Sequence, residues 1–421
     1  MKFVLAFYGT RGDVEPGVAV GRELLRRGHE VHTVVPPDMV GFVESAGLAA
    51  VASGPDSRAW QVAHRDLLTG FARFWKIRDL IRLGREDWDL FAQCSRETSA
   101  TLKSLADGAD LLLTGVICEE PAANVAEYYD IPLATLHIFP VRANSQLVPI
   151  LPAPLGRSAM TVSEWLAWPM MKTLEDGQRR ELSLPKATAP PSRRIAERGS
   201  LEIQAYDEVC FAGLPAEWAK WRGQRPFVGA LTLELPTGAD EEVASWIAAG
   251  TPPIYFGFGS MSVESPADTL AMISAACARL GERALVCFGC NDFSHVPQFD
   301  HVKMVGAMNH AAAFPACRAI VHHGGAGTTA AALRAGVPTL ILWTTPEQAI
   351  WAARVKRLKV GSGRRFSATT EKSLVADLRP ILAPQYVTRA RDIATRMTKS
   401  AASVAAAADL VEDFARSRRV S

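Results

Sequence analysis

The residues best suited to chemistry lie in one glycine-rich segment, His322 to Thr329, which reads HHGGAGTT. The apolar run 318–321 precedes it, and the residues from Ala330 to Arg334 can continue as a helix until Gly336. We therefore predict a strand, a glycine turn and a helix in that order. Backbone N–H groups at the start of such a helix are unpaired and lie at its positive end, so this segment is suited to bind a diphosphate. The alternative is an ordinary glycine-rich turn of an α/β protein.

A second glycine turn, Gly9-Thr10-Arg11-Gly12-Asp13, follows the first predicted strand. Open α/β sheets bind ligands at the carboxyl ends of their strands, which is where Asp13 is expected. We predict that Asp13 accepts a proton from an acceptor hydroxyl. The alternative is that Asp13 only caps the helix that follows. The turn is not the dinucleotide motif G-x-G-x-x-G, which argues against a nicotinamide-dependent dehydrogenase.

A polar pair, Glu347-Gln348, follows the apolar run 341–343 and Pro346. Carboxylate and amide oxygens accept hydrogen bonds from sugar hydroxyls, and the amide N–H₂ group donates in return. These two residues could therefore hold a sugar. The alternative is helix initiation, because an acid is favourable near the positive end of a helix.

The composition is that of a soluble globular protein without a nucleic-acid partner. The chain has 421 residues, of which 48% are apolar and 21% are charged, and its formal net charge is only +2. This length favours two or three domains. The seven cysteines are scattered and odd in number, which is not the pattern of a disulfide framework, so we expect a reducing compartment.

The sequence predicts no secretion signal, membrane span or metal site. The N-terminal apolar run fits a first strand and is too short for a signal peptide. No run reaches the roughly 20 apolar residues of a membrane span. The pair Cys287 and Cys290 lacks a second pair for zinc and is interpreted as structural, and Asp87-Trp88-Asp89 is interpreted as the solvated face of a helix. We therefore expect a cytoplasmic protein without a metal or other cofactor.

Two series of alternating strands and helices divide the chain. The first begins with a strand at 3–8, a loop at 9–13, a helix at 15–27 and a strand at 30–35, and the second begins near Pro253. This alternation predicts α/β domains with parallel sheets. Linker composition, with prolines and a Gly-Ala-Asp-Glu-Glu stretch, separates the two series. The predicted divisions are 1–222, 223–251 as the linker region, 252–400, and a final helix at 401–421.

With these motifs in order, the chain resembles the UDP-glycosyltransferase superfamily over essentially its whole length. Its donor-site signature is similar to Gly257-Phe258-Gly259-Ser260, to the segment 322–329 and to the pair Glu347-Gln348. The opening segment, Gly9 to Pro16, resembles the bacterial branch that decorates glycopeptide antibiotics and the mycobacterial enzymes related to those that build glycopeptidolipids.

The resemblance implies an α/β protein of GT-B fold, with two Rossmann-like domains whose parallel sheets face across a cleft. The first domain would bind the acceptor, the second would bind the nucleotide sugar, and the last helix would pack back on the first domain. The implied reaction is an inverting transfer without a metal. Asp13 and Thr10 would be the catalytic candidates, and Glu347 with Gln348 would bind the sugar. The residues implied to hold the pyrophosphate are Ser260, His323, Gly325, Ala326, Gly327 and Thr328.

The chain departs from the plant members of the superfamily at three positions. Val305 replaces the tryptophan that stacks on the base, Ala331 replaces the acid that holds the ribose, and the catalytic histidine of the first loop is absent. The loop 305–310 would then bind the base of the nucleotide through backbone groups and apolar contact, with Val305 and Met308 as the nucleobase-binding residues. This favours a dTDP-linked 6-deoxyhexose such as rhamnose over a UDP-linked hexose.

The acceptor is expected to be a lipidic or peptidic molecule such as a glycopeptidolipid. The proline- and tryptophan-rich region 149–191 predicts loops and short helices over an apolar cleft. The stretch 71–85 alternates apolar and basic residues and could lie on an anionic membrane, although a helix packed on its own domain is the alternative. Other functions left open are a UDP-hexose-dependent transferase acting on a sterol or other small lipophilic acceptor, a sugar-nucleotide epimerase or hydrolase, and a non-catalytic binder.

Overall fold

The computed structural model describes residues 1–70, 77–147, 152–261, 263, 265–289 and 296–419. Within these ranges the chain forms two compact units. Unit 1 contains Met1–Ala205, Gly213–Leu231 and Ala401–Ser421, and unit 2 contains Tyr206–Ala212 and Thr232–Ser400. The division between Leu231 and Thr232 lies inside the region interpreted as a linker, where the structure also has a helix, α9 (Asp240–Ala248).

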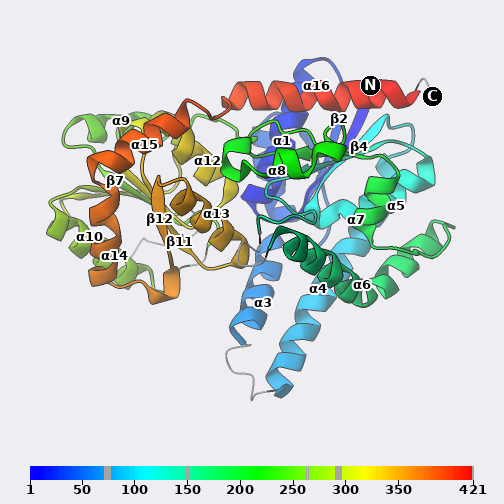
Figure 1. Cartoon of the computed structure of the whole chain (residues 1–421), viewed down its shortest axis with the longest axis horizontal. Helices are drawn as coiled ribbons and strands as arrows, with labels where there is room; N and C mark the ends of the chain where they lie inside the picture. Colours follow the sequence, from blue (N-terminus) through cyan, green and yellow to red (C-terminus); the bar gives the residue numbers. More distant parts are fainter. Residues whose placement is uncertain (71–76, 148–151, 262, 264, 290–295, 420–421) are drawn as a thin grey trace. The chain divides into compact units, whose positions relative to one another are not determined.

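Unit 1 is built on a parallel six-stranded sheet in the order β3-β2-β1-β4-β5-β6 (Figure 1). The strands are β1 (Lys2–Ala6), β2 (Glu30–Val35), β3 (Ala49–Ala52), β4 (Leu111–Gly115), β5 (Leu133–His137) and β6 (Leu201–Gln204). The α-helices are α1 (Arg11–Arg26), α2 (Val40–Ser45), α3 (Ser57–Gly70), α4 (Ile77–Leu105), α5 (Glu119–Tyr129), α6 (Ala153–Glu181), α7 (Pro191–Glu197), α8 (Leu214–Glu217) and α16 (Ser400–Arg419). Its central strands are apolar and buried, as expected where helices cover both faces of a parallel sheet.

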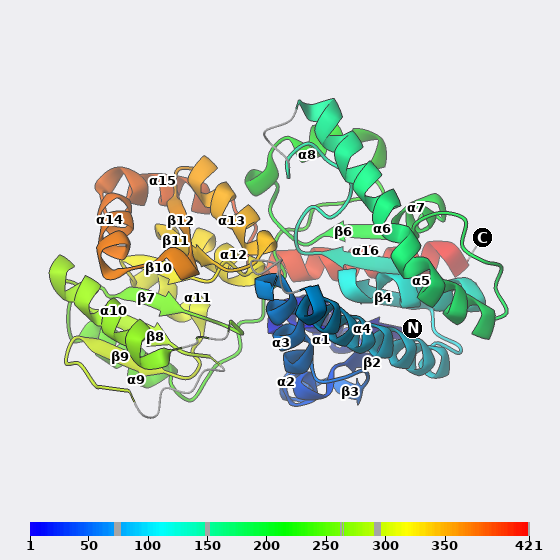
Figure 2. The same ribbon diagram turned by 90° about the horizontal axis from the view of Figure 1, so that it is seen from below.

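Unit 2 repeats this architecture with the sheet order β12-β11-β10-β7-β8-β9 (Figure 2). The strands are β7 (Ile254–Gly257), β8 (Ala284–Cys287), β9 (Val302–Val305), β10 (Ala319–His322), β11 (Thr339–Trp343) and β12 (Gly361–Arg365). The other helices are α10 (Pro266–Leu280), α11 (His310–Ala313), α12 (Ala326–Ala335), α13 (Pro346–Arg357), α14 (Glu371–Ile381) and α15 (Pro384–Ala394). One core cluster joins the sheet to α10 and α14, and another joins its opposite face to α9 and α12.

Both sheets have the strand order of a doubly wound fold. The first three strands are added in one direction across the sheet, and the fourth strand returns to the other side of the first, so the order reverses at the central pair. That pair is β1 and β4 in unit 1, and β7 and β10 in unit 2. Ligands of such sheets bind outside the carboxyl ends of the strands at this point. The glycine turns after β1, β7 and β10 all lie there, so the predicted fold class is confirmed and the predicted motifs occupy the positions where it binds ligands.

The structure corrects two of the predicted elements. The helix predicted at 15–27 begins at Arg11, because Thr10 supplies its N-cap. The region 149–191, predicted as loops and short helices, is largely the 29-residue helix α6. Its helical period was hidden because apolar side chains lie on its outward face as well as its inward face, and because Pro169 is accommodated inside the helix.

The last helix, α16, belongs to unit 1 and is tied to its first elements by charged hydrogen bonds. Arg27 Nη1 lies 2.7 Å from Asp409 Oδ1, and His29 Nε2 lies 2.7 Å from Glu412 Oε1. No helix among the described residues is long and apolar enough to cross a membrane.

Candidate functional site

The turn after β10 has the strand, turn and helix order predicted for the segment 322–329. Gly324 has a φ of +100°, and a Cβ placed there would lie 2.7 Å from Ile341 Cγ2 and 3.0 Å from Gln348 Cβ. Only glycine fits this conformation and this space. Gly325 is the N-cap of α12, and the first bond of that helix runs from Thr329 N to Gly325 O at 2.9 Å.

The open end of α12 is therefore formed by three of the predicted pyrophosphate residues. Ala326, Gly327 and Thr328 are half-buried and precede the first residue whose N–H is bonded within the helix. Their N–H groups lie at the positive end of the helix dipole. This is the geometry of an anion site on a helix of ten residues.

The imidazole of His323 lies between the turns that follow β7 and β10. A Cβ at Gly259 would lie 2.6 Å from His323 Cε1, and a Cβ at Gly325 would lie 2.7 Å from His323 Nε2. Gly259 also has a φ of +56°, so both space and backbone conformation require glycine there. The structure thus brings His323 and the turn that carries Ser260 together.

Burial keeps the His323 imidazole neutral. It lowers the pKa of His323 to about 4, although a hydrogen bond with the backbone of Gly257 opposes this shift. A neutral imidazole has one N–H, so His323 donates it either to the backbone of Gly257 or to a phosphate oxygen, and it brings no positive charge. The attraction of this site for an anion therefore depends on the helix end and on N–H donors.

The sequence analysis gave no separate role to the neighbouring His322, which holds the turn in place through a hydrogen bond with its backbone. Its side chain is only 1% exposed, and its Nδ1 accepts a hydrogen bond from Gly324 N at 3.0 Å. That bond makes Nε2 the protonated nitrogen of the neutral ring, and burial holds the pKa of His322 well below its usual value. The signal in the sequence was the doubled histidine at the end of a buried strand.

Gln348 lies beside the same turn, but its side-chain oxygen already accepts hydrogen bonds from within the protein. Gln348 Oε1 accepts from Thr344 N at 2.7 Å, from Thr344 Oγ1 at 2.9 Å and from Thr345 N at 3.2 Å. Thr345 is the N-cap of α13, and the two residues form a capping box. Only the amide N–H₂ group of Gln348 remains to donate to a sugar, and the half-buried Glu347 lies in the same helical turn.

The predicted nucleobase residues require revision. Val305 and Met308 are 6% and 7% exposed, and both belong to a hydrophobic core cluster of unit 2. Their side chains therefore offer almost no surface to a base. Gly306 and Ala307, between them, are exposed, so a base at this loop would meet mainly backbone.

The turn after β1 holds the two predicted catalytic residues in a capping box. Thr10, not Asp13, is the N-cap of α1, and Asp13 lies in the first turn of that helix. Asp13 Oδ2 accepts from Thr10 N at 2.8 Å and from Thr10 Oγ1 at 3.1 Å, so the cap does not occupy Oδ1. A Cβ at Gly9 would lie 2.5 Å from Asp13 Oδ2, which explains the glycine.

Burial raises the pKa of the Asp13 carboxyl, and the hydrogen bonds from Thr10 partly oppose this shift. A raised pKa makes a carboxylate a stronger base. The capping-box role of Asp13 is therefore compatible with the predicted role as a base.

A buried ionic network in unit 1 was also missed in the sequence analysis. Arg142 donates to Glu119 through Nη1 at 2.9 Å and Nη2 at 3.0 Å, and His137 Nε2 lies 2.6 Å from Glu119 Oε1. Glu202 also bonds Arg142 and Arg225. Burial alone would raise the pKa of Glu119, but Arg142 and His137 outweigh it and hold that pKa at about 2. The charges of this network are paired with one another, so it is not a binding site for a charged ligand. Its role is to support the carboxyl ends of β4 and β5.

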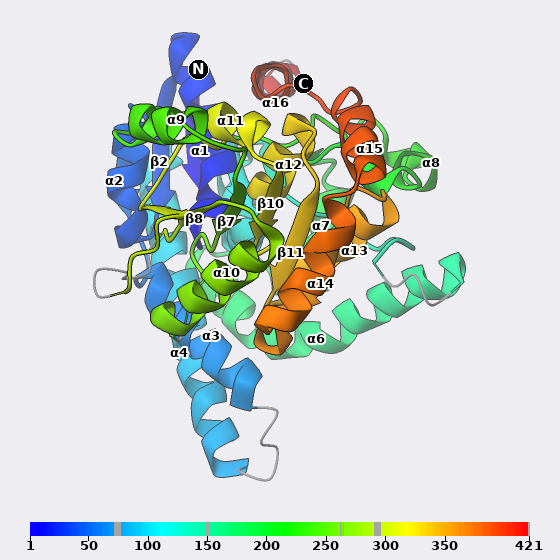
Figure 3. The same ribbon diagram turned by 90° about the vertical axis from the view of Figure 1, so that its left-hand side faces the viewer.

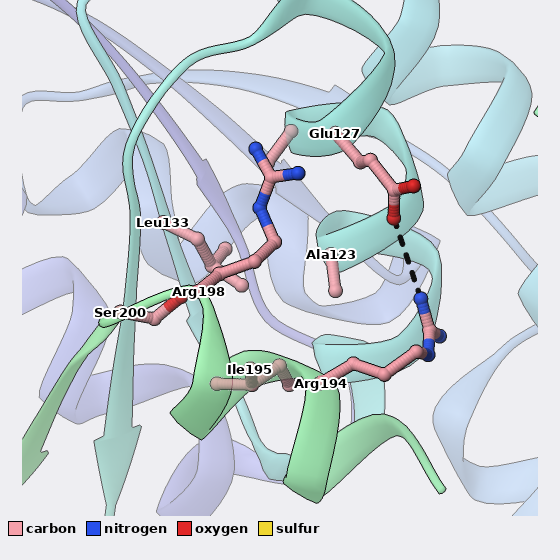
Figure 4. A pocket seen from close by; sticks show the side chains of 8 residues that line it. Ala123, Glu127, Leu133, Arg194, Ile195, Arg198 and Ser200 are labelled. Carbon is pink, nitrogen blue, oxygen red and sulfur yellow. Dashed lines mark hydrogen bonds and ion pairs between the residues drawn. The ribbon is translucent and has the colours of Figure 1, made fainter. Parts of the chain in front are cut away.

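Figure 4 shows a small pocket between α5 and α7 that contains none of the predicted site residues. Arg194 and Glu127 lie at its edge, with Nη1 and Oε2 3.4 Å apart. The other cation of the lining, Arg198, has its Nη2 3.4 Å from Asp130 Oδ1, so both cations of the pocket are paired with carboxylates.

Other predictions concern metals and surfaces. No group of three or more His, Cys, Asp or Glu side chains in the described ranges is placed to hold a metal ion. Asp87 and Asp89 lie in α4, where Asp89 is exposed, as expected for a solvated face, but Asp87 is half-buried with its Oδ1 out of contact with solvent. Cys290 and the residues 71–76 of the basic stretch lie outside the described residues.

Two family models match the chain. The Glycosyltransferase family 28 N-terminal domain matches residues 3–84, and the Erythromycin biosynthesis protein CIII-like, C-terminal domain matches residues 284–415. The chain is 62% identical over 421 residues to "Uncharacterized glycosyltransferase Rv1524" of Mycobacterium tuberculosis, with all of both chains covered. It is 27% identical over 432 residues to sterol 3-beta-glucosyltransferase UGT80B1 of Arabidopsis thaliana, which covers 97% of this chain and 67% of that protein.

Solved structures share the fold over almost the whole chain. The glycotransferase of kitacinnamycin has a TM-score of 0.69 at 17% identity, covering 98% of both chains. VinC in complex with dTDP has a TM-score of 0.62 at 18% identity, covering 99% of this chain and 100% of that one. The spinosyn rhamnosyltransferase SpnG has a TM-score of 0.63 at 17% identity, covering 97% and 100%. With full-length identity of 62% to a glycosyltransferase and two sheets of matching architecture, the chain belongs to the glycosyltransferases of GT-B fold.

Proposed function

We propose that this glycosyltransferase moves a 6-deoxyhexose such as rhamnose from a dTDP donor to a hydroxyl of a lipidic or peptidic acceptor, such as a glycopeptidolipid. The observation that carries the proposal is the convergence of two glycine turns on His323 at the open end of α12. Such a site suits a diphosphate leaving group, because its donors are fixed before the glycosidic bond breaks.

In the proposed reaction the acceptor hydroxyl loses its proton to Asp13 as its oxygen bonds to C1 of the sugar. The bond from C1 to the diphosphate breaks in the same displacement, so the configuration at C1 inverts. The electron pair of that bond leaves with the diphosphate. Its new negative charge would be stabilised by the N–H groups at Ala326 to Thr328 and by neutral His323, without a metal or other cofactor.

The choice of a dTDP donor has two supports. The exposed Gly306 and Ala307 leave room for a base read through backbone groups, and the structural neighbour VinC is described in complex with dTDP. The neighbour SpnG is described as a rhamnosyltransferase. A UDP-hexose donor with a sterol acceptor is the second candidate, supported by the similarity to the sterol 3-beta-glucosyltransferase.

A thermal-shift titration with dTDP and UDP tests the donor site. A ligand that binds only the folded state stabilises it by about 2.7 kcal/mol at one hundred times its Kd, so dTDP should raise the Tm by several degrees, and more than UDP does. His323→Ala should reduce the shift, while His301→Ala, which alters a half-buried histidine elsewhere in unit 2, should leave it intact. A larger shift with UDP would favour the sterol-type alternative, and no shift with either nucleotide would contradict the proposal.

A further inference from the structure

The outward side of α6 carries a row of large apolar side chains. Ten large hydrophobic side chains of the described residues are exposed, and five of them fall within sixteen residues of this helix. They are Leu155 (57% exposed), Val162 (55%), Trp165 (39%), Leu166 (74%) and Met170 (72%). Scattered exposed hydrophobic residues are ordinary, but a contiguous group marks an interaction surface.

These side chains form one face, which we call the outer face of α6. Leu155, Val162, Leu166 and Met170 are spaced by seven, four and four residues, which is the spacing of one side of a helix. On the opposite side, Met160, Glu164 and Trp168 are half-buried, and further along the helix Glu175, Gln178 and Arg179 are buried. Figure 3 shows the N-terminal part of α6 extending away from the strands of its own unit.

The outer face carries no charge. From Ser158 to Met170 the only charged residue is Glu164, which is half-buried and bonded to the hydroxyl of Ser192. The nearby cationic side chains already have partners within the protein. Lys172 Nζ donates to Ala187 O at 2.6 Å, and Arg157 Nη1 lies 3.5 Å from Glu217 Oε1. The face therefore fits an uncharged apolar environment and has no means to select anions.

The size of the face distinguishes between a protein and a bilayer as its occupant. From Leu155 to Met170 a helix rises roughly 22 Å, and at about 10 Å in width this gives an area on the order of 200 Å². A stable interface between proteins buries about 800 Å² on each partner. A bilayer sets no such minimum, and apolar side chains next to a tryptophan are suited to the boundary between headgroups and acyl chains.

We propose that the outer face of α6 inserts into the surface of a lipid bilayer, and that uncharged lipid is sufficient. The inference rests on the proposed function in one respect, because a surface-bound enzyme would have access to a lipidic acceptor. It differs from the interpretation of the basic stretch 71–85, which would bind an anionic membrane through its charges.

Sedimentation with phosphatidylcholine vesicles tests the proposal with the full-length chain. The protein should sediment with neutral vesicles, and the bound fraction should hold when the salt is raised to about 0.5 M, since salt screens only charged contacts. The double variant Leu166→Gln/Met170→Gln should bind at least about tenfold more weakly, because it removes two large apolar groups. The control Leu25→Gln/Tyr128→Gln changes two exposed apolar residues elsewhere in unit 1 and should bind like the wild type.

Three results would overturn the inference. Binding only to anionic vesicles and only at low salt would assign the contact to a basic surface. A dimer in light scattering that the double variant dissociates, without vesicle binding, would assign the face to a second copy. Equal vesicle binding by the wild type and the double variant would place the contact elsewhere. The dTDP-induced Tm shift should be the same in all these variants, so failure of the donor proposal would be seen separately.

Discussion

At the scale of single residues, burial shifts the pKa of two groups in opposite directions and suits each to its proposed role. It raises the pKa of Asp13 and lowers that of His323 to about 4. In both cases the neutral form is favoured over the charged form. Asp13 thereby gains basicity, and His323 stays a neutral donor at physiological pH.

The base assignment is tested by Asp13→Asn. We expect kcat to fall about 10²- to 10⁴-fold, the usual contribution of a positioned base, while the dTDP-induced Tm shift in unit 2 persists. In the wild type, turnover should rise with pH as Asp13 loses its proton, with a midpoint above 3.8 because burial raises the pKa. The Asn variant should lack this acid limb. Unchanged turnover would show that another group takes the proton.

The matched control for that experiment is Thr10→Ala, which removes the helix cap but keeps the carboxylate. A lost N-cap costs about 1 kcal/mol of stability, so the Tm should fall by a few degrees. If Thr10 only orients Asp13, its kcat should fall much less than that of Asp13→Asn. An equal loss in both variants would indicate that Thr10 itself takes part in the chemistry.

At the scale of elements, α12 connects the proposed anion site to the two ends of the longer segment of unit 2, Thr232–Ser400. Its N-terminus forms the site, and near its other end Arg334 donates to Thr398 O and to Thr232 Oγ1, both at 2.8 Å. Ser400 Oγ donates to Thr232 O at 2.8 Å, so one guanidinium holds the two ends of this segment together.

Replacement of Arg334 by lysine tests this connection. Lysine keeps the charge but lacks the planar fork that serves two acceptors. We expect a loss of roughly 1.5–3 kcal/mol in the free energy of unfolding, as for hydrogen bonds to a charged group. Arg318→Lys is the control, because Arg318 is half-exposed and its pair with Glu282 is at 3.2 Å. A loss no larger than that of the control, measured by urea denaturation, would contradict the role of Arg334.

Sequence reasoning located the elements of the site because glycine requirements are local. Gly259 and Gly324 have positive φ angles and no room for a side chain, and both were recognised as turn residues next to apolar strands. Helix α6 was missed because apolar residues on two sides obscure the helical period. The network around Glu119 was missed because its members come from separate parts of the chain.

At the scale of the whole molecule, the last helix, α16, belongs to the same unit as the first strand, β1. Glu412 on α16 accepts from His29, and Arg27 Nη1 lies 3.5 Å from its other oxygen. Burial raises the pKa of Glu412, but His29 and Arg27 outweigh it, so the net shift is downward. A carboxylate with a lowered pKa stabilises the folded state above its unfolded pKa, and this stability is lost as the pH falls through the folded pKa.

Glu412→Gln should therefore destabilise unit 1 by roughly 1–2 kcal/mol at pH 7. The difference from the wild type should shrink as the pH falls below the ordinary glutamate pKa of about 4.3, since both side chains then become neutral. Urea denaturation at pH 7 and at acid pH measures this. Asp413→Gln, at a more exposed neighbouring position, should change little. A difference that persists unchanged in acid would show that charge is not its cause.

The sequence by itself determined the two series of strands and helices, the glycine turns and the order of the site motifs, because backbone conformation and strand periodicity depend on neighbouring residues. Only the tertiary structure decided which side chains are available. It placed Val305 and Met308 in the core, engaged the oxygen of Gln348 in a helix cap and exposed the outer face of α6. Burial and pairing depend on residues far apart in the chain, so they cannot be read from local patterns.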